Sequence, residues 1–260
     1  MSYSFYQVDA FSDHIFGGNP AGVCPLESWL PDEVMQNIAM ENNLAETAFF
    51  IKEDDNFHVR WFTPAVEVDL CGHATLGTSW VIFNILGYTG SEIRFRSRSG
   101  WLTVTRTGDL LTLDFPADTL SRLEPPAGLI EAMGVRSVDV LKGKTDWMIV
   151  VGTQQEVESL NPDLGALMKV PCRGVMVTAK GDTVDFVSRF FAPRSGVPED
   201  PVTGSAHTSL TPYWAGKLGK NEMKAMQLSK RKGNLELKFS GERVFISGKA
   251  NLYLQGEIFF

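Results

Sequence analysis

The chain has 260 residues, of which 43% are hydrophobic and 21% are charged, and its formal net charge is −7 at pH 7. A chain of this length buries roughly 70–75% of its unfolded surface, so it needs no disulfide or metal for stability, and its acidity argues against a nucleic-acid partner. The three cysteines, Cys24, Cys71 and Cys172, are widely spaced, which predicts neither a disulfide framework nor a metal motif. No apolar run reaches the roughly 18 residues of a membrane span, and the first residues lack a secretory pattern, so we expect a cytoplasmic protein without a membrane partner.

The first half of the chain is predicted to consist mainly of strands. A strand is expected at residues 3–11, and the glycines and Asn-Pro step of FGGNPAGV, residues 16–23, predict a loop that is either a tight turn or the border of a site. A helix is expected at residues 31–41, because Pro31 suits the first helical position and two acidic residues follow it. Further strands are expected at residues 44–51, 57–62, 92–97, 101–106 and 110–115.

Glu46 is the exception in the otherwise apolar segment LAETAFFI, residues 44–51. A carboxylate buried without a partner costs several kcal/mol, so a functional requirement is one explanation for its presence. The other explanation is that Glu46 points outward on an alternating strand.

Two long segments, residues 73–86 and 205–218, are apolar on nearly every side, which predicts one buried helix in each half. Gly87 and Gly219 are expected to end them, and Pro212 is expected to kink the second. The Pro-containing segment PADTLSRLEPPAG predicts a linker, and therefore domains at residues 1–118 and 127–260. In the second half we expect a short helix at residues 162–168 and strands at residues 138–141, 147–151, 174–178, 184–191, 235–239, 243–247 and 251–258. Each half then resembles a curled sheet wrapped around its helix.

An internal repeat links the two halves. RWFTPAVEVDLCGHA, residues 60–74, matches RFFAPRSGVPEDPVTGSAH, residues 189–207. A gap-free alignment of the shared Arg, Phe, Pro and Val positions places Cys71 opposite Asp200. An insertion at residues 201–203 then aligns Gly72 and His73 with Gly204 and Ser205. The repeat predicts two similar domains with a shared site between them.

The two helix starts indicate anion binding. A buried helix start offers unpaired N–H groups and about half a positive charge, and two of them can hold a carboxylate or a developing negative charge. Glu46 is the candidate acid/base, with His73, Asp200 and Cys71 beside the cradle. These groups suit the movement of a proton on a carboxylate substrate, a reaction that requires no metal and no cofactor.

Other interpretations of the same residues remain. Asp69, Cys71 and His73 alternate like metal ligands, but no fourth ligand is evident. Cys71 and His73 suggest the nucleophile and base of a cysteine hydrolase, although residues two apart are expected to have poor geometry for direct contact. Alternatively, Cys71 is a small buried hydrophobic residue without a catalytic role. A non-catalytic carboxylate-binding protein is a further alternative. GHATLGTS lacks the lysine of a phosphate-binding loop, and His58 and His207 are expected to be structural.

Four motifs in order, DAFSDHIFGGNPAGV, NLAETAFF, FTPAVEVDLCGHATLG and EDPVTGSAH, resemble those of the phenazine-biosynthesis isomerase family in the diaminopimelate epimerase superfamily. The resemblance spans essentially the whole chain. It implies an α+β fold of two pseudo-symmetric halves, each a barrel-like mixed sheet around a central buried helix. It also implies cofactor-independent isomerisation of a small molecule in the interdomain cleft, and often a homodimer.

The resemblance implies roles for individual residues as well. The epimerase branch uses two cysteines; Cys71 fits the first position but Asp200 fills the second, so we do not expect two-thiol chemistry. QLSKRKGNL, residues 227–235, departs from a glycine-richer segment of the family, which predicts an altered substrate contact. The implied acid/base is Glu46, and the implied motif and substrate-site positions are Gly72, His73, Asp200, Ser205 and Asn19.

Overall fold

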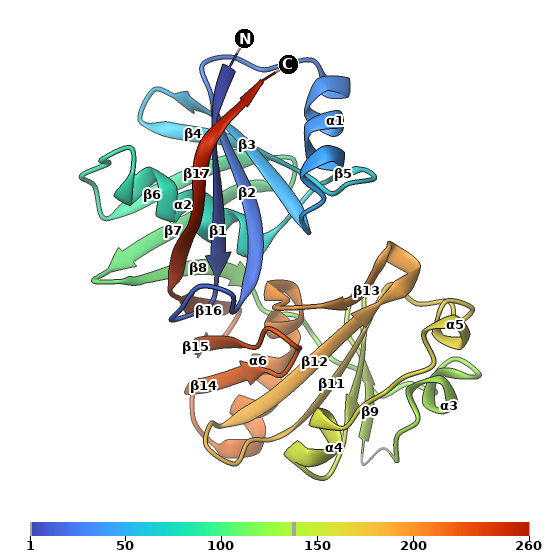
Figure 1. Cartoon of the computed structure of the whole chain (residues 1–260). Coiled ribbons are helices and arrows are strands. Elements are labelled where there is room, and N and C mark those ends of the chain that lie inside the picture. Colours follow the sequence, from blue (N-terminus) through green and yellow to red (C-terminus); the bar gives the residue numbers. More distant parts are fainter. Residues whose placement is uncertain (1, 137–138, 260) are drawn as a thin grey trace. The chain divides into compact units, whose positions relative to one another are not determined.

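A computed structural model describes residues 2–136 and 139–259 as two compact units. The first unit runs up to Phe115 and resumes at Ile246, and the second is Pro116–Phe245 (Figure 1). The expected division at residues 1–118 and 127–260 agrees with the first boundary to within three residues but differs in the linker and in the C-terminal segment. The predicted linker belongs to the second unit, because Ala117 N–H bonds to the Glu242 carbonyl, and the last strand belongs to the first unit.

The first unit is a curved sheet around one helix. Its strands lie in the order β17-β1-β2-β3-β4-β6-β7-β8, and helix α2 packs against β1, β2, β3 and β17 (Figure 1). The amphipathic helix α1 covers the outside of β3 and β4. The elements are β1 Ser2–Ala10, β2 Asn19–Leu26, α1 Asp32–Asn42, β3 Glu46–Glu53, β4 Asn56–Phe62, β5 Glu67–Val68, α2 Gly72–Asn84, β6 Glu92–Ser97, β7 Gly100–Thr107, β8 Leu110–Pro116 and β17 Ala250–Phe259.

The second unit repeats this plan around helix α6. Its strands lie in the order β9-β10-β11-β12-β14-β15, with β13 also paired to β12, and β16 runs from the second unit into the first. The elements are α3 Leu129–Met133, β9 Asp139–Lys142, β10 Trp147–Val150, α4 Gln154–Glu158, α5 Leu164–Leu167, β11 Val175–Lys180, β12 Phe186–Ala192, the 3₁₀ turn η1 Pro193–Ser195, β13 Val197–Asp200, α6 Gly204–Leu218, β14 Glu222–Gln227, β15 Gly233–Ser240 and β16 Arg243–Gly248.

The strand directions confirm the pseudo-symmetry that the repeat predicts. The consecutive pairs β1–β2, β2–β3, β3–β4, β4–β6 and β6–β7 are antiparallel, parallel, antiparallel, parallel and antiparallel. The pairs β9–β10, β10–β11, β11–β12, β12–β14 and β14–β15 follow the same series. The mixed α+β fold with one central helix in each unit is thus as predicted.

Hydrogen bonds inside the central helices explain how polar residues are buried there. The hydroxyls of Thr75, Thr78 and Ser79 in α2 donate to carbonyls four residues earlier, so the helix satisfies its own polar groups. In α6, Trp214 instead donates its indole N–H to Thr178 on β11 at 2.9 Å, which fixes the helix against the sheet. Helix α6 continues through Pro212.

Local predictions differ from the structure at several points, among them the end of α2, which is Asn84 and is not closed by Gly87 as expected. The loop expected at residues 16–23 ends at Gly18, because Asn19 and Pro20 already pair with β1. Strand β14 and the short elements β5, α3, α4 and β13 were not expected. The strand expected from residue 138 begins at Asp139, and Val138 lies outside the described residues. Within residues 2–136 and 139–259, every helix is too short or too polar to span a bilayer.

Candidate active site

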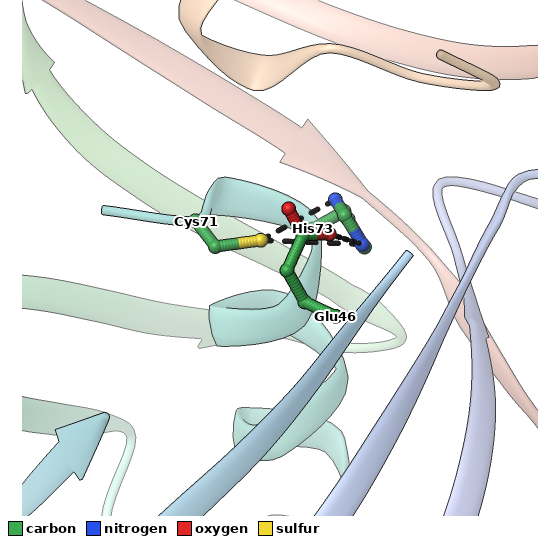
Figure 2. A group of neighbouring side chains, drawn as sticks. All are labelled: Glu46, Cys71 and His73. Carbon is green, nitrogen blue, oxygen red and sulfur yellow. Dashed lines mark hydrogen bonds and ion pairs between the residues drawn. The ribbon is translucent and has the colours of Figure 1, made fainter. Parts of the chain in front are cut away.

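A buried carboxylate–imidazole pair forms the centre of the site in the first unit. Glu46 is the first residue of β3 and His73 is the second residue of α2, and Glu46 Oε2 lies 3.1 Å from His73 Nε2 (Figure 2). The exposed fractions of the two side chains are 17% and 6% respectively. The alternative in which Glu46 points outward is therefore wrong, and the unexplained carboxylate has a partner.

Two further side chains contact the other ring nitrogen of His73. Asn19, fully buried at the start of β2, places its amide nitrogen 3.2 Å from His73 Nδ1. The Cys71 sulfur lies 3.5 Å from the same nitrogen. Direct contact between Cys71 and His73 is thus present, contrary to the expected poor geometry, because the chain turns into α2 between them.

The charges in this cluster favour a protonated imidazole and a neutral thiol. Burial lowers the pKa of His73, but Cys71 and Glu46 outweigh burial and raise it well above the ordinary value. Burial, together with the Glu46 charge, raises the pKa of Cys71 to about 11, so the thiol stays neutral near pH 7. The Glu46 carboxylate is therefore the charge that holds a proton on His73.

The Asn19 amide can serve either protonation state of His73, but its orientation in the structure, with the N–H donor toward Nδ1, suits the neutral ring. A protonated imidazole donates from both nitrogens, whereas a neutral one accepts at one of them. Asn19 offers an N–H donor to the neutral ring and, after a rotation of its amide, a carbonyl acceptor to the charged ring. The residue therefore suits a histidine that changes its protonation state.

Both central helices begin without a capping side chain. Cys71 and Thr203 occupy the N-cap positions of α2 and α6, and within the described residues neither accepts a side-chain cap hydrogen bond. Gly72 and Gly204 follow as the first helical residues. Helix starts of this kind attract anions through their N–H groups and dipole.

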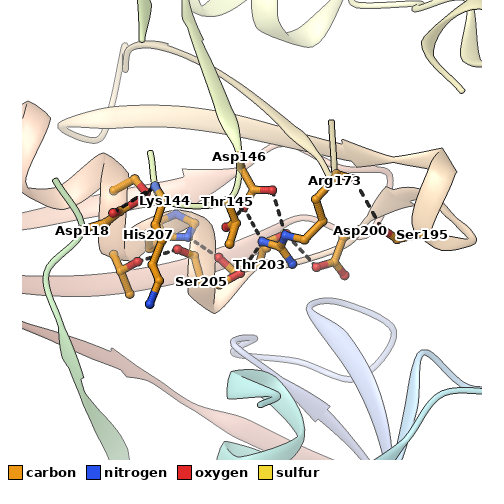
Figure 3. Close-up of polar contacts among 12 residues, drawn as sticks. Asp118, Lys144, Thr145, Asp146, Arg173, Ser195, Asp200, Thr203, Ser205 and His207 are labelled. Atoms are coloured by element: carbon orange, nitrogen blue, oxygen red, sulfur yellow. Dashed lines mark hydrogen bonds and ion pairs between the residues drawn. The ribbon is translucent and has the colours of Figure 1, made fainter. Parts of the chain in front are cut away.

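In the second unit, a hydrogen-bonded network positions Asp200 (Figure 3). The Thr203 hydroxyl donates to Asp200 Oδ2 at 2.7 Å. Gln227, fully buried at the end of β14, accepts from the Thr203 backbone N–H at 2.9 Å and donates to the Asp200 carbonyl at 2.7 Å. Gln227 is thus a positioning residue that the sequence analysis did not identify; it opens the segment in which an altered contact was expected.

Ser205 lies exposed in the first turn of α6, beside a guanidinium (Figure 3). Arg173 Nη2 approaches Ser205 Oγ at 3.4 Å and also forms a close ion pair with Asp146, which is 3% exposed. The buried carboxylate therefore fixes the arginine next to the serine.

The insertion in the repeat lies earlier than expected. Arg60 holds Glu67 through two bonds of 2.8 and 2.7 Å, and Arg189 holds Glu199 through two bonds of 2.6 and 3.0 Å. The separation is seven residues in the first pair and ten in the second. The three additional residues therefore lie between Arg189 and Glu199, and the insertion predicted at residues 201–203 is wrong.

A model of the phenazine biosynthesis-like protein family matches residues 8–256. An uncharacterized isomerase of Pseudomonas aeruginosa is 54% identical, with 99% of each chain covered. The chain belongs to the phenazine biosynthesis-like family. A phenazine biosynthesis-like domain-containing protein of Homo sapiens is 38% identical, again with 99% of each chain covered. The resemblance drawn from the four motifs is confirmed, and the chain is an isomerase of this family.

Solved structures agree with this assignment. A crystal structure of a PhzF-family phenazine biosynthesis protein from Enterococcus faecalis has a TM-score of 0.97 and 45% identity, and each chain is covered completely. A probable proline racemase from Agrobacterium radiobacter has a TM-score of 0.67 at 10% identity, with 98% of this chain and 92% of that chain covered, and so shares the fold. The epimerase-like fold predicted for the chain is confirmed.

In this member of the phenazine biosynthesis-like family, the counterpart of Cys71 is Thr203 and not Asp200. The corrected register aligns the two N-cap residues. The hydrogen bonds to these two N-cap carbonyls are also equivalent in the two units: Thr75 donates to the Cys71 carbonyl at 2.6 Å, and His207 Nδ1 contacts the Thr203 carbonyl at 2.8 Å. A hydroxyl at the second position supports the expectation that two-thiol chemistry does not operate.

The structure also bears on the metal, hydrolase and histidine interpretations. Asp69 is exposed and does not join the cluster; instead, ligand atoms of Glu46, Cys71 and His73 lie within 4.8 Å of one another. We favour proton transfer over metal binding because His73 already faces Glu46 and Asn19 through its two nitrogens. A thiol with a pKa of about 11 is a poor nucleophile.

The other two histidines of interest form packing contacts. His58 contacts Glu53 and packs edge-on against Trp29. His207 is fully buried and stacks on Phe186, and burial lowers its pKa to about 4. Both arrangements are consistent with the structural roles predicted for these residues.

Proposed function

We propose that this chain catalyses the cofactor-independent isomerisation of a small carboxylate-bearing substrate, amino-acid-like or cyclic, by general acid/base catalysis in an interdomain cleft. The Glu46–His73 pair carries the proposal. A buried carboxylate in contact with an imidazole at an uncapped helix start provides a base, a proton reservoir and an anion-binding site together.

In the proposed reaction, Glu46 removes a proton from a substrate carbon next to the carboxylate or a conjugated group. The electron pair of the broken C–H bond moves into that group, which becomes an enolate-like anion. N–H groups at the starts of α2 and α6, at Gly72 and Gly204, are proposed to stabilise this anion. Protonation at another carbon, or at the other face, then gives the isomer.

Asp200 and His73 are proposed to complete the proton path. Thr203 and Gln227 hold Asp200 in a defined orientation, which suits a second acid/base that serves a second position of the substrate. His73 stores a proton beside Glu46, and Asn19 adapts to either state of the ring. We propose Ser205 and Cys71 as contacts to the substrate.

Deuterium incorporation tests the proposal. Small amino-acid-like and cyclic carboxylates are incubated with the protein in deuterium oxide, and label is followed by NMR. We expect label in the substrate class that is turned over, and a large loss of labelling for Asp200→Asn. Glu53→Gln is the matched control, because Glu53 lies at the far end of β3 and pairs with Arg96.

The same experiment separates this function from a non-catalytic one. A substrate that binds tightly without any exchange would identify a small-carboxylate binding protein, whereas loss of activity on removal of the Cys71 thiol would favour a cysteine hydrolase. We further propose a homodimer, which light scattering of the purified chain tests.

A further inference from the structure

A basic cavity of about 470 Å³ lies in the second unit, on residues that the proposed isomerisation does not use as acids or bases. None of the described residues that line it is acidic, although the chain as a whole has a net charge of −7. The lining consists of Lys142, Thr145, Pro171, Cys172, Arg173, Arg194 and Ser195.

Local contacts hold the three cations of this cavity in place. Arg173 is fixed by the buried Asp146, and Arg194 donates to the Val170 carbonyl at 3.2 Å. Lys142 lies over the ring of Trp147, with Nζ 5.6 Å from the ring centre. Each cation thus already contacts the protein, and Arg173 is held most firmly because its partner Asp146 is buried, which reduces the entropy cost of binding.

The charges of the basic cavity do not balance. Asp146 offsets one of the three cations, and in the described part of the chain no carboxylate pairs with Lys142 or Arg194. The local charge is therefore +3 − 1, or +2, at neutral pH. Burial and the Asp146 charge raise the pKa of the Cys172 thiol, and the charges of Lys142 and Arg194 act in the opposite direction, so both cations lie near this thiol of the cavity lining.

We propose that this cavity binds a compact oxyanion of charge −2, namely a phosphate group or a small dicarboxylate. Two unpaired cations next to a fixed arginine match such an anion in charge, and arginine is suited to bidentate binding of phosphate or carboxylate oxygens. The site goes beyond the proposed isomerisation, because no acid or base of that reaction lines the cavity, although Arg173 also approaches the proposed substrate contact Ser205 at 3.4 Å.

Titration calorimetry on the full-length chain tests the proposal, with inorganic phosphate as the probe and sodium chloride used to keep the ionic strength constant. We expect saturable binding of one phosphate per chain. Arg194→Gln and Lys142→Gln should each weaken it about tenfold or more, since each variant removes a charge-assisted contact to the anion. Malonate in place of phosphate then distinguishes a dicarboxylate site from a phosphate site.

Two control variants keep the experiment interpretable. Arg194→Lys retains the charge and should bind phosphate within a few-fold of the unmodified chain, which separates loss of charge from loss of the Val170 contact. Arg122→Gln removes an exposed arginine of the same unit that pairs with Asp139, and it should leave phosphate affinity unchanged. An unchanged unfolding temperature without phosphate shows that each variant is folded.

Two results would overturn the proposal. One is the absence of saturable binding of either phosphate or malonate at millimolar concentrations. The other is a phosphate affinity that is the same in Arg194→Gln, Lys142→Gln and the control Arg122→Gln. In that case the anion binds elsewhere on the chain.

Discussion

The Glu46→Gln substitution removes one charge from the Glu46–His73 pair and keeps the shape of the side chain. In the unmodified chain, Cys71 and Glu46 outweigh burial and raise the pKa of His73. The Cys71 thiol is neutral near pH 7, so the variant leaves burial as the main influence on the ring. We therefore expect the pKa of His73 to fall below its ordinary value of about 6.5.

The size of the effect follows from the contact distance. At the 3.1 Å separation of the two groups, opposite charges attract by about 5 kcal/mol for an effective dielectric constant of about 20. The cost of burying both charges offsets most of this attraction, and the net contribution of a charged hydrogen bond is roughly 1.5–3 kcal/mol. We expect Glu46→Gln to lower the free energy of unfolding by about 2 kcal/mol at slightly acidic pH.

The pH dependence of this loss has a definite sign. A histidine whose pKa is raised by folding contributes stability that is fully present below its unfolded pKa of about 6.5. This contribution is lost as the pH rises through the higher pKa of the folded state. The difference in unfolding free energy between the unmodified chain and Glu46→Gln should therefore narrow as the pH rises above neutrality.

NMR titration of the histidine rings, together with urea unfolding at several pH values, measures both effects. His207 serves as an internal reference, because burial lowers its pKa to about 4 and it should stay neutral in both proteins. A His73 ring that titrates at the same pH with and without Glu46, or a stability difference that widens above neutral pH, would refute the electrostatic reasoning.

Three further substitutions test separate parts of the structure. Cys71→Ser should retain turnover within about tenfold of the unmodified chain. In the unmodified chain, iodoacetamide should modify Cys71 slowly at pH 7, because the thiol has a pKa of about 11. Rapid modification with loss of activity would favour the hydrolase. Gln227→Leu leaves the Thr203 N–H and the Asp200 carbonyl without this partner. We therefore expect the free energy of unfolding in urea to fall by roughly 2–4 kcal/mol and kcat to fall as well. An unchanged free energy of unfolding would show that the network is dispensable. A Cβ added at Gly77 of α2 would lie 3.5–3.7 Å from side-chain atoms of Val8 on β1 and Ala21 on β2, so Gly77→Ala should be tolerated while Gly77→Leu should cost about 1–3 kcal/mol by overpacking. Equal unfolding midpoints for the two variants would contradict this packing.

The central helices and most strands could be predicted because the local sequence composition indicates that they are buried. Helix α2 is apolar on nearly every side, and only a buried helix tolerates that pattern. Strand β14 also carries a readable signal, since Met223, Ala225 and Gln227 are buried while Glu222 and Lys224 are exposed, but its charged residues concealed the alternation. The C-terminal strand β17 belongs to the first unit because it pairs with β1, and the local sequence does not indicate this long-range pairing.

The contact between Glu46 and His73 agrees with the sequence analysis, whereas the other contacts of the candidate site could not be predicted. Glu46 and His73 come together as expected of an otherwise unexplained buried carboxylate. The position of the insertion was not predictable from matching letters, because only the ion pairs Arg60–Glu67 and Arg189–Glu199 fix the register. The roles of Thr203 and Gln227 likewise depend on hydrogen bonds across 24 residues.

In the proposed reaction, Glu46 removes the proton from the substrate carbon. The most direct test of this claim is the single-turnover rate of deuterium entry into the substrate in deuterium oxide, compared between the unmodified chain, Glu46→Gln and the control Glu53→Gln. We predict that Glu46→Gln lowers this rate by roughly 10²–10⁴-fold, the usual contribution of a general acid/base, and that Glu53→Gln leaves it unchanged. Equal rates for all three proteins would contradict the claim.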